Sequence, residues 1–253
     1  MVAERKDVWA SGHAYEPYVG RWSRLVARQF VDWLGVPPSS DWIDVGCGTG
    51  ALCEVILASA SPRQVTGIDP SDGFVAFARK HVADPRASFR VGDAQALPLA
   101  SHSFDAAVAG LVINFVPDQA KAVSEMRRAT RREGVVAAYV WDYAGAMQMM
   151  RAFWDAAVAL DPNAVALDEG RRFPVCHPEP LAKLFEDAGL KDVAVRASMC
   201  RRCSKTSTIT GRPFLAVRPR RRDIACRFPK IVVPYCASAF GRACPSTTMA
   251  ASI

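Results

Sequence analysis

Three glycines spaced two residues apart are the part of this sequence best suited to chemistry. They are Gly46, Gly48 and Gly50, and they follow a short, largely apolar run at residues 42–45. Without a Cβ atom, glycine adopts positive φ angles and lets a ligand contact the backbone closely. Asp69 ends the next apolar run, nineteen positions after Gly50, where an acidic side chain can accept hydrogen bonds from both hydroxyls of a ribose. This spacing predicts a nucleotide-like ligand.

Two further carboxylates belong to the same pattern. Asp44 lies inside the first apolar run, where a carboxylate needs a partner because burial of an unpaired charge is costly. Asp93 follows a third run, residues 89–92, and a fourth run at residues 104–109 begins Phe-Asp. Acids at the ends of successive strands indicate a ligand site along one edge of a sheet.

The elements that must position these residues alternate between strand and helix patterns. Helical periodicity follows the glycine turn at residues 51–60 and returns at residues 71–81 and from residue 118. A fifth strand is predicted at residues 135–140 and a sixth at 193–195, after another helix. The predicted fold is therefore α/β, Rossmann-like and doubly wound, with a mainly parallel sheet and helices on both faces.

At this point the sequence resembles a known family. The motifs that carry the resemblance are DVGCGTG at 44–50, GIDPS at 67–71, VGDAQALP at 91–98, FDAAVAGLVINFVPD at 104–118 and the helix with Glu125-Met126-Arg127-Arg128. Together they resemble the class I S-adenosylmethionine-dependent methyltransferases, and within them the small-molecule branch of ubiquinone and menaquinone biosynthesis. The resemblance covers roughly residues 13–198. It implies the class I methyltransferase fold, S-adenosylmethionine as cofactor and a small-molecule methyl acceptor.

The resemblance also assigns cofactor-binding roles. It implies that the glycine turn binds the methionine portion, Asp69 the ribose hydroxyls, and Asp93 with Ala94 the adenine edge. Asp44 would support the turn and reach the amino group through water, and Arg21 could meet a carboxylate. The expected cofactor-binding residues are Asp44, Gly46, Cys47, Gly48, Gly50, Asp69, Pro70, Asp93, Ala94, Gly110 and Arg21.

The acceptor side is harder to recognise in the sequence. Methyl transfer from a sulfonium is a single in-line displacement, so proximity and alignment are the main requirements and a general base is optional. No catalytic residue is assigned. The candidates for the acceptor pocket are Asn114, Tyr18, Trp141 and Asp142. Tyr18 could equally anchor a lid, and the methionine-rich segment 144–160 could roof an apolar pocket or, slightly favoured, form a core helix.

Two other functions are compatible with parts of the pattern. A nicotinamide-dependent oxidoreductase shares the strand, turn and terminal acid, but its fingerprint is G-x-G-x-x-G, whereas these glycines run G-x-G-x-G. A non-catalytic S-adenosylmethionine-binding protein would show the same cofactor residues. Turnover of the cofactor separates that alternative from an enzyme.

Length and composition favour one core. The chain has 253 residues, 50% of them hydrophobic, which suits a single α/β domain. We divide it into an N-terminal helical cap (1–40), a cofactor-binding domain (41–198) and a tail (199–253). No apolar run is long enough to span a bilayer and no leader pattern is present, so a cytoplasmic protein is expected.

The tail differs from the body in charge and cysteine content. From Cys200 onward there are eleven Lys and Arg and one acid, Asp223, and five of the eight cysteines lie there. No basic face of the body matches it, so no nucleic-acid partner is expected. The Cys200-x-x-Cys203 spacing lacks a second pair, so no metal site is expected either. The tail is either a native extension or the product of a shifted reading frame. A shifted reading frame predicts that the sheet lacks a regular final antiparallel strand.

Overall fold

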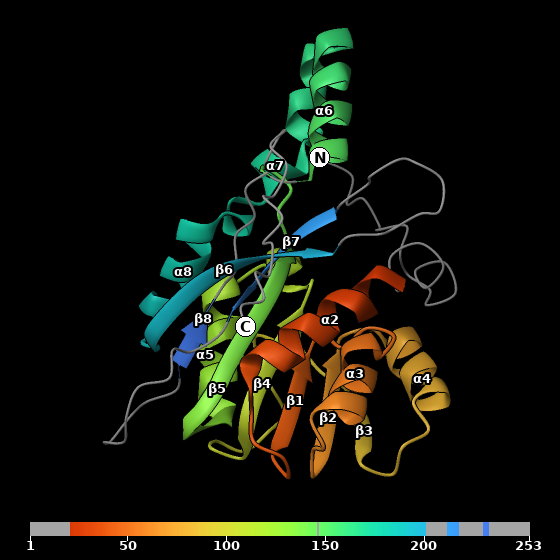
Figure 1. The fold of residues 1–253 in the computed structure, drawn as a ribbon, viewed down its shortest axis with the longest axis vertical. Helices are drawn as coiled ribbons and strands as arrows, with labels where there is room; N and C mark the ends of the chain where they lie inside the picture. Colours follow the sequence, from red (N-terminus) through yellow and green to blue (C-terminus); the bar gives the residue numbers. More distant parts are fainter. Residues whose placement is uncertain (1–20, 146, 201–211, 218–229, 233–253) are drawn as a thin grey trace, which may run out of the picture.

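An eight-stranded sheet forms the centre of the molecule (Figure 1). The computed structural model describes residues 21–145, 147–200, 212–217 and 230–232. The strand order is β3-β2-β1-β4-β5-β7-β6-β8, and β1 to β5 pair in parallel. The strands are β1 (Asp41–Val45), β2 (Gln64–Asp69), β3 (Ala87–Val91), β4 (Phe104–Gly110), β5 (Thr130–Trp141), β6 (Lys191–Cys200), β7 (Arg212–Val217) and β8 (Lys230–Val232). The predicted doubly wound α/β fold is confirmed.

Helices cover both faces of this sheet (Figure 1). One layer holds α2 (Arg21–Leu34), α3 (Ala51–Ser59) and α4 (Asp72–His81), and the other holds α5 (Gln119–Ala129) and α8 (Pro178–Asp187). Each of the expected starts of α4 and α5 has a capping side chain, because Ser71 accepts from Phe74 N and Asp118 from Lys121 N. Within the described residues, no helix is long and apolar enough to cross a membrane.

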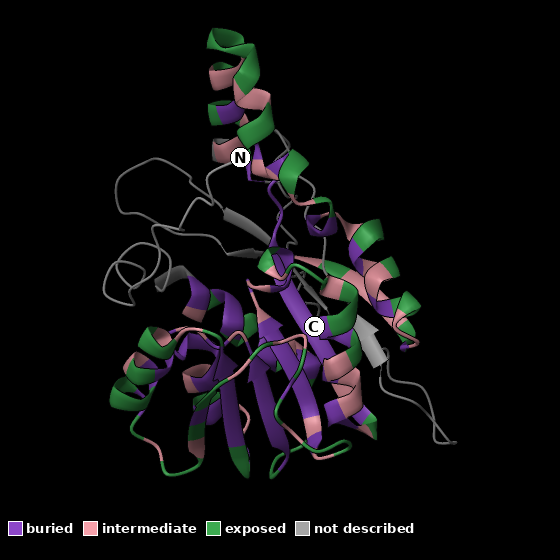
Figure 2. Ribbon diagram, turned by 180° about the vertical axis from the view of Figure 1, so that it is seen from behind, coloured by how far each residue is buried: buried purple, intermediate pink, exposed green. Residues whose placement is uncertain are grey.

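The core lies between the sheet and its helices, and Figure 2 shows the central strands as its most buried part. All five residues of β1 are buried. The Phe30 ring of α2 packs on Tyr139 of β5 with 4.8 Å between ring centroids, which fixes α2 across the sheet. Leu25, on the same helix, is 51% exposed. The helix therefore buries the face that holds Phe30 and exposes the face that holds Leu25.

The part of the sheet beyond β5, where no regular final antiparallel strand is expected, consists of short pieces: β7 has six residues, β8 has three, and the pairing of β6 with β8 shifts register between Lys191 and Ala194. β7 lies between β5 and β6 and is antiparallel to both, with Trp141 opposite Phe214 and Cys200 opposite Arg212. Residues 214–217 form an apolar run, Phe-Leu-Ala-Val, inside the basic tail. An inserted strand gives partners to backbone groups of β5 and β6 that would otherwise be unpaired. Whether the tail is a native extension or the product of a shifted reading frame stays a prediction.

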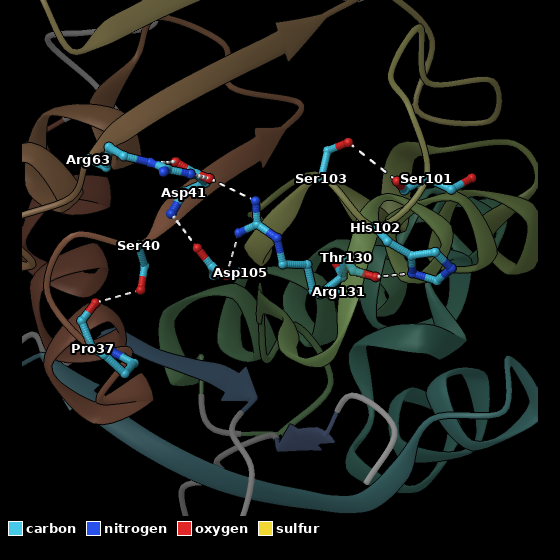
Figure 3. A network of polar contacts seen from close by, with 10 residues as sticks. All are labelled: Pro37, Ser40, Asp41, Arg63, Ser101, His102, Ser103, Asp105, Thr130 and Arg131. Carbon is cyan, nitrogen blue, oxygen red and sulfur yellow. Dashed lines mark hydrogen bonds and ion pairs between the residues drawn. The ribbon is translucent and has the colours of Figure 1, made fainter. Parts of the chain in front are cut away.

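The arginines near the end of α5 have structural roles. Arg127 donates to Ala188 O at 3.0 Å, and Arg128 donates to Leu97 O and Leu99 O. Arg131 joins a charged network at the start of β1 (Figure 3), where it bonds both Asp41 and Asp105. Arg128 and Arg131 thus tie the end of α5 and the start of β5 to distant loops and strands.

An arm projects beyond the carboxyl edge of the sheet (Figure 1). It consists of α6 (Gln148–Leu160), η3 (Pro162–Leu167), α7 (Glu169–Arg172) and η4 (Pro174–Cys176). The favoured interpretation of segment 144–160 as a core helix is wrong, because α6 packs mainly on η3, and Phe153 and Leu160 are 57% and 89% exposed. An ion pair between Arg151 and Asp168 holds α6 to the start of α7.

Candidate cofactor and acceptor site

The glycine turn joins the end of β1 to the start of α3 at the carboxyl edge of the sheet. Gly46, Gly48 and Gly50 have φ angles of 75°, 52° and 88°, in the left-handed region that other residues avoid. A Cβ on Gly46 would lie 2.5 Å from a methyl group of Val112, whereas a Cβ on Gly48 would meet nothing within 4 Å. Packing therefore requires a glycine at position 46, and the space beside Gly48 is open to a ligand.

Asp69 lies beside this turn, at the end of β2. The side chain is 6% exposed, and its carboxylate accepts from Gly48 N and Ser71 N, both at 2.9 Å. Burial raises the pKa of Asp69, while the two backbone N–H groups oppose that rise. Carboxylate oxygens accept more than one hydrogen bond each, so Asp69 can hold the turn and still accept from ribose hydroxyls.

Asp44 is the most unusual residue of the site. It lies in β1 between Gly67 of β2 and Val108 of β4 and is 1% exposed. Its Oδ2 accepts from the Cys53 thiol at 3.2 Å, and its Oδ1 has no hydrogen-bond partner among the described residues. Burial raises the pKa of Asp44 to about 7, and the charge of Asp69 adds to the rise. A buried oxygen without a partner fits a cofactor that brings a donor to the turn.

The third acid stands at the end of β3. Asp93 is exposed and accepts from the backbone and side chain of Gln95, which lowers the pKa of Asp93. Gly92 N donates to Asp69 O at 3.1 Å, so the turns after β2 and β3 are neighbours. Pro70 is exposed and Ala94 half-buried on these turns. The expected ribose and adenine residues are thus adjacent, on one edge of the sheet.

The segment after β4 closes over the glycine turn. A Cβ on Gly110 would lie 2.6 Å from the Tyr139 hydroxyl, and Leu111 has a φ of 60°, uncommon for a leucine. The chain then places Val112 against Gly46 and continues into η2 (Ile113–Phe115). Asn114, a predicted pocket residue, is 5% exposed, and its Nδ2 has no hydrogen-bond partner among the described residues.

The two pocket candidates at the end of β5 are both buried. Trp141 is 8% and Asp142 1% exposed. Asp142 Oδ1 accepts from Gly145 N at 2.9 Å, so this carboxylate holds the turn that leads to the arm. The charge of Asp142 also contributes to raising the pKa of Cys176 to about 12, after burial as the main cause.

An aromatic cluster at the same edge was missed by sequence reasoning. It is formed by Phe115, Tyr143 and Phe173, with ring centroids of Phe115 and Phe173 5.2 Å apart and of Tyr143 and Phe173 5.8 Å apart. Phe115 follows β4 and Tyr143 follows β5. Because both residues come after the carboxyl end of a strand, the sequence could have identified them as pocket residues. No local signal identifies Phe173, because it reaches the cluster from the far end of the arm. We call these three residues the aromatic cluster.

Some predicted site residues lie beyond what the structure describes. Tyr18 is outside the described residues, and Arg21 begins α2 with a side chain that is not described. Their assignments stay predictions. The same applies to Cys47 as a cofactor contact, although the structure shows it 6% exposed in the turn.

Comparison with known proteins identifies the class. Residues 43–138 match the methyltransferase domain family. A demethylmenaquinone methyltransferase of Roseiflexus sp. is 31% identical over 179 residues, which is 64% of this chain and 73% of that protein. A ubiquinone/menaquinone biosynthesis C-methyltransferase of Desulfotalea psychrophila is 27% identical over 192 residues, 71% of this chain and 75% of the relative.

Solved structures agree on the fold. A Thermotoga maritima S-adenosylmethionine-dependent methyltransferase, described as a possible histamine N-methyltransferase, superposes with a TM-score of 0.57 at 21% identity, covering 87% of this chain and 91% of the other. With the glycine turn and its acids, this fold defines a class I S-adenosylmethionine-dependent methyltransferase. The chain belongs to the ubiquinone/menaquinone biosynthesis type within that class. Its cofactor is S-adenosylmethionine, and the nicotinamide alternative is excluded.

Proposed function

We propose that this methyltransferase transfers a methyl group by in-line displacement to a small, partly apolar acceptor that contains an aromatic or quinone-type ring. The observation that carries the proposal is the aromatic cluster at the carboxyl ends of β4 and β5. The cluster and the glycine turn lie at the same edge of the sheet, because Val112, three residues before Phe115, packs on Gly46. An acceptor ring beside the cluster would therefore be close to the cofactor.

The cluster suits a planar ring. Phe115 is 53% exposed and meets Phe173 edge-on with an interplanar angle of 78°. Aromatic rings favour such edge-to-face and offset contacts, worth about 0.5 to 1.5 kcal/mol beyond the area that they bury. The names of the relatives, which act in menaquinone and ubiquinone biosynthesis, point to the same acceptor chemistry.

The residues of this chain would contribute position rather than acid–base chemistry. S-adenosylmethionine supplies the transferable methyl group and a neutral leaving group. The glycine turn and Asp69 orient it, and the aromatic cluster aligns the acceptor and excludes water. The Nδ2 of Asn114, which has no hydrogen-bond partner among the described residues, could donate to an oxygen of the acceptor.

A panel of acceptors tests this proposal. The purified protein is incubated with S-adenosylmethionine and a demethylated naphthoquinol, a catechol, a primary amine or RNA, and S-adenosylhomocysteine is measured. We expect turnover with the ring-containing acceptors. Methylation of RNA but of no small molecule would contradict the proposal, and binding of the cofactor without any turnover would favour the non-catalytic alternative. The cytoplasmic location and the lack of a nucleic-acid partner stay predictions.

The cluster itself is tested with a matched pair of variants. Phe173→Leu removes ring contacts, so we expect the acceptor KM to rise about 3- to 10-fold, with the Kd for S-adenosylmethionine unchanged. Phe153→Leu makes the same change at a ring of α6 that is 57% exposed and contacts Trp154 rather than the three rings of the cluster, and should leave both constants unchanged. Equal effects of the two substitutions would show that the cluster does not contact the acceptor.

A further inference from the structure

A cation lies directly beside the aromatic cluster. Arg172 is the last residue of α7, and its guanidinium carbon lies over the ring of Phe173, 5.2 Å from the ring centroid. A guanidinium that contacts an aromatic ring can still donate through its other N–H groups, in a fork that matches the geometry of a carboxylate. The ring of Phe173 therefore holds this cation next to the place proposed for the acceptor.

The acids of the arm do not neutralise Arg172. Its side chain is exposed, and in the part of the chain that the structure describes it forms no hydrogen bond or ion pair. The two acids closest to it in sequence have other partners, because Asp168 pairs with Arg151 and Glu169 accepts from Trp154 Nε1. The charge of Arg172 is thus available to a ligand.

A second donor lies at the opposite end of the cluster's sequence, beside Phe115. Asn114 is 5% exposed, and its Nδ2 has no hydrogen-bond partner among the described residues. A buried amide N–H without a partner is costly, so an oxygen of a ligand would be a suitable partner. Asp142, a buried acid close to the cluster in the chain, already accepts from Gly145 N. Both polar side chains that remain available beside the cluster, Asn114 and Arg172, are therefore donors.

We propose that Arg172 binds an anionic group of the acceptor, so that the preferred acceptor is an aromatic acid with a carboxylate next to its ring rather than a neutral ring. The ring packs on the aromatic cluster, the carboxylate accepts from Arg172, and a second oxygen of the acceptor accepts from Asn114 Nδ2. This inference rests on the proposed function and narrows its class of acceptor. Arg172 acts on which acceptor binds, and the displacement itself does not require it.

Two ligands of nearly equal size and shape test the inference. 3,4-Dihydroxybenzoate and 3,4-dihydroxybenzamide share the same ring, but only the first is an anion at neutral pH. Their Kd values are measured by calorimetry on protein saturated with S-adenosylhomocysteine, and their kcat and KM values with S-adenosylmethionine. We expect the carboxylate to bind about 3- to 10-fold more tightly than the amide, as for a bidentate charge pair that is partly exposed. High salt should reduce this preference.

Variants then assign the preference to Arg172. Arg172→Gln should weaken the carboxylate to the level of the amide and affect the amide much less, whereas a purely structural role would weaken both ligands alike. Arg172→Lys keeps the charge without the planar fork and should restore part of the preference.

Arg171→Gln is the matched control. Arg171 is also exposed, but its charge acts within the arm, where it lowers the pKa of Asp168 after the larger effect of Arg151. We expect this variant to keep the wild-type preference for the carboxylate. The comparison of the two ligands on the wild-type protein stands even if a variant fails to fold.

Three results would overturn the inference and leave the proposed function intact. The first is equal affinity of the wild-type protein for the carboxylate and the amide. The second is turnover of the neutral naphthoquinol without binding of the carboxylate. The third is an unchanged preference in folded Arg172→Gln, which would place the recognising cation elsewhere. Absence of turnover with every ring-containing acceptor, and of binding by both ligands, would instead contradict the proposed function and the inference with it.

Discussion

At the scale of single residues, Asp69 holds the turn with a carboxylate that we propose also accepts from the cofactor's ribose hydroxyls. We expect Asp69→Ala to weaken S-adenosylmethionine about 10- to 150-fold, because a charge-assisted hydrogen bond to a buried ligand is worth roughly 1.5 to 3 kcal/mol. Isothermal calorimetry measures this. Asp187→Ala removes an exposed acid that pairs with Lys183 at the end of α8 and should leave the affinity unchanged. Unaltered binding by Asp69→Ala would place the ribose elsewhere.

At the scale of elements, the glycine turn connects β1, α3 and the segment after β4. The turn packs against Val112 at Gly46 and leaves space for a ligand beside Gly48. The substitutions Gly46→Ala and Gly48→Ala test these two roles separately. Both introduce a Cβ at positive φ, which costs about 1 kcal/mol, but only the Cβ at position 46 collides with Val112. We expect Gly46→Ala to lower the free energy of unfolding by a further 1 to 3 kcal/mol.

Gly48→Ala should instead remain folded and lose cofactor affinity, because its Cβ enters the space beside the turn. Thermal unfolding with and without S-adenosylmethionine distinguishes the two variants. If Gly48→Ala is stabilised by the cofactor as much as the wild type is, the cofactor does not occupy that space.

At the scale of the whole molecule, the charged network at the start of β1 stabilises the end of the sheet opposite the site (Figure 3). Asp41, whose side chain is 1% exposed, pairs with Arg63 and Arg131, and Asp105 accepts from Asp41 N at 2.8 Å. We expect Arg131→Met to lower the free energy of unfolding by about 1.5 to 3 kcal/mol. Lys183→Met breaks an exposed pair and should cost less than about 0.5 kcal/mol. Urea denaturation measures both.

The same network gives stability a pH dependence. Hydrogen bonds from Arg63, the largest cause, and from Arg131 lower the pKa of Asp41 below its unfolded value. This contribution is therefore present above pH 4 and is lost as the pH falls through the lowered pKa of the folded state. Arg131→Met should shrink that loss. An identical pH profile for wild type and variant between pH 2 and 5 would show that Arg131 does not act through Asp41.

The sequence by itself determined the order of the elements and the position of the glycine turn; the cofactor-binding roles of its residues stay predictions. Glycines at positive φ and acids that end apolar runs are local features, so the turn at Gly46 and Gly48 and the strand ends at Asp69 and Asp93 could be predicted before the fold was known. The fold class followed from the alternation of strand and helix patterns for the same reason.

Only the tertiary structure decided which distant side chains meet. Three contacts illustrate this: the hydrogen bond from the Cys53 thiol to Asp44, the packing of Phe173 beside Phe115, and the pairing of Asp41 with Arg131. The last of these joins residues 90 positions apart. The position of β7 depends on the backbone groups that β5 and β6 offer on either side of it. The exposure of α6 depends on its packing on η3 rather than on the sheet. Such contacts follow from how the packed elements lie in space, and no periodicity or spacing in the chain encodes them locally.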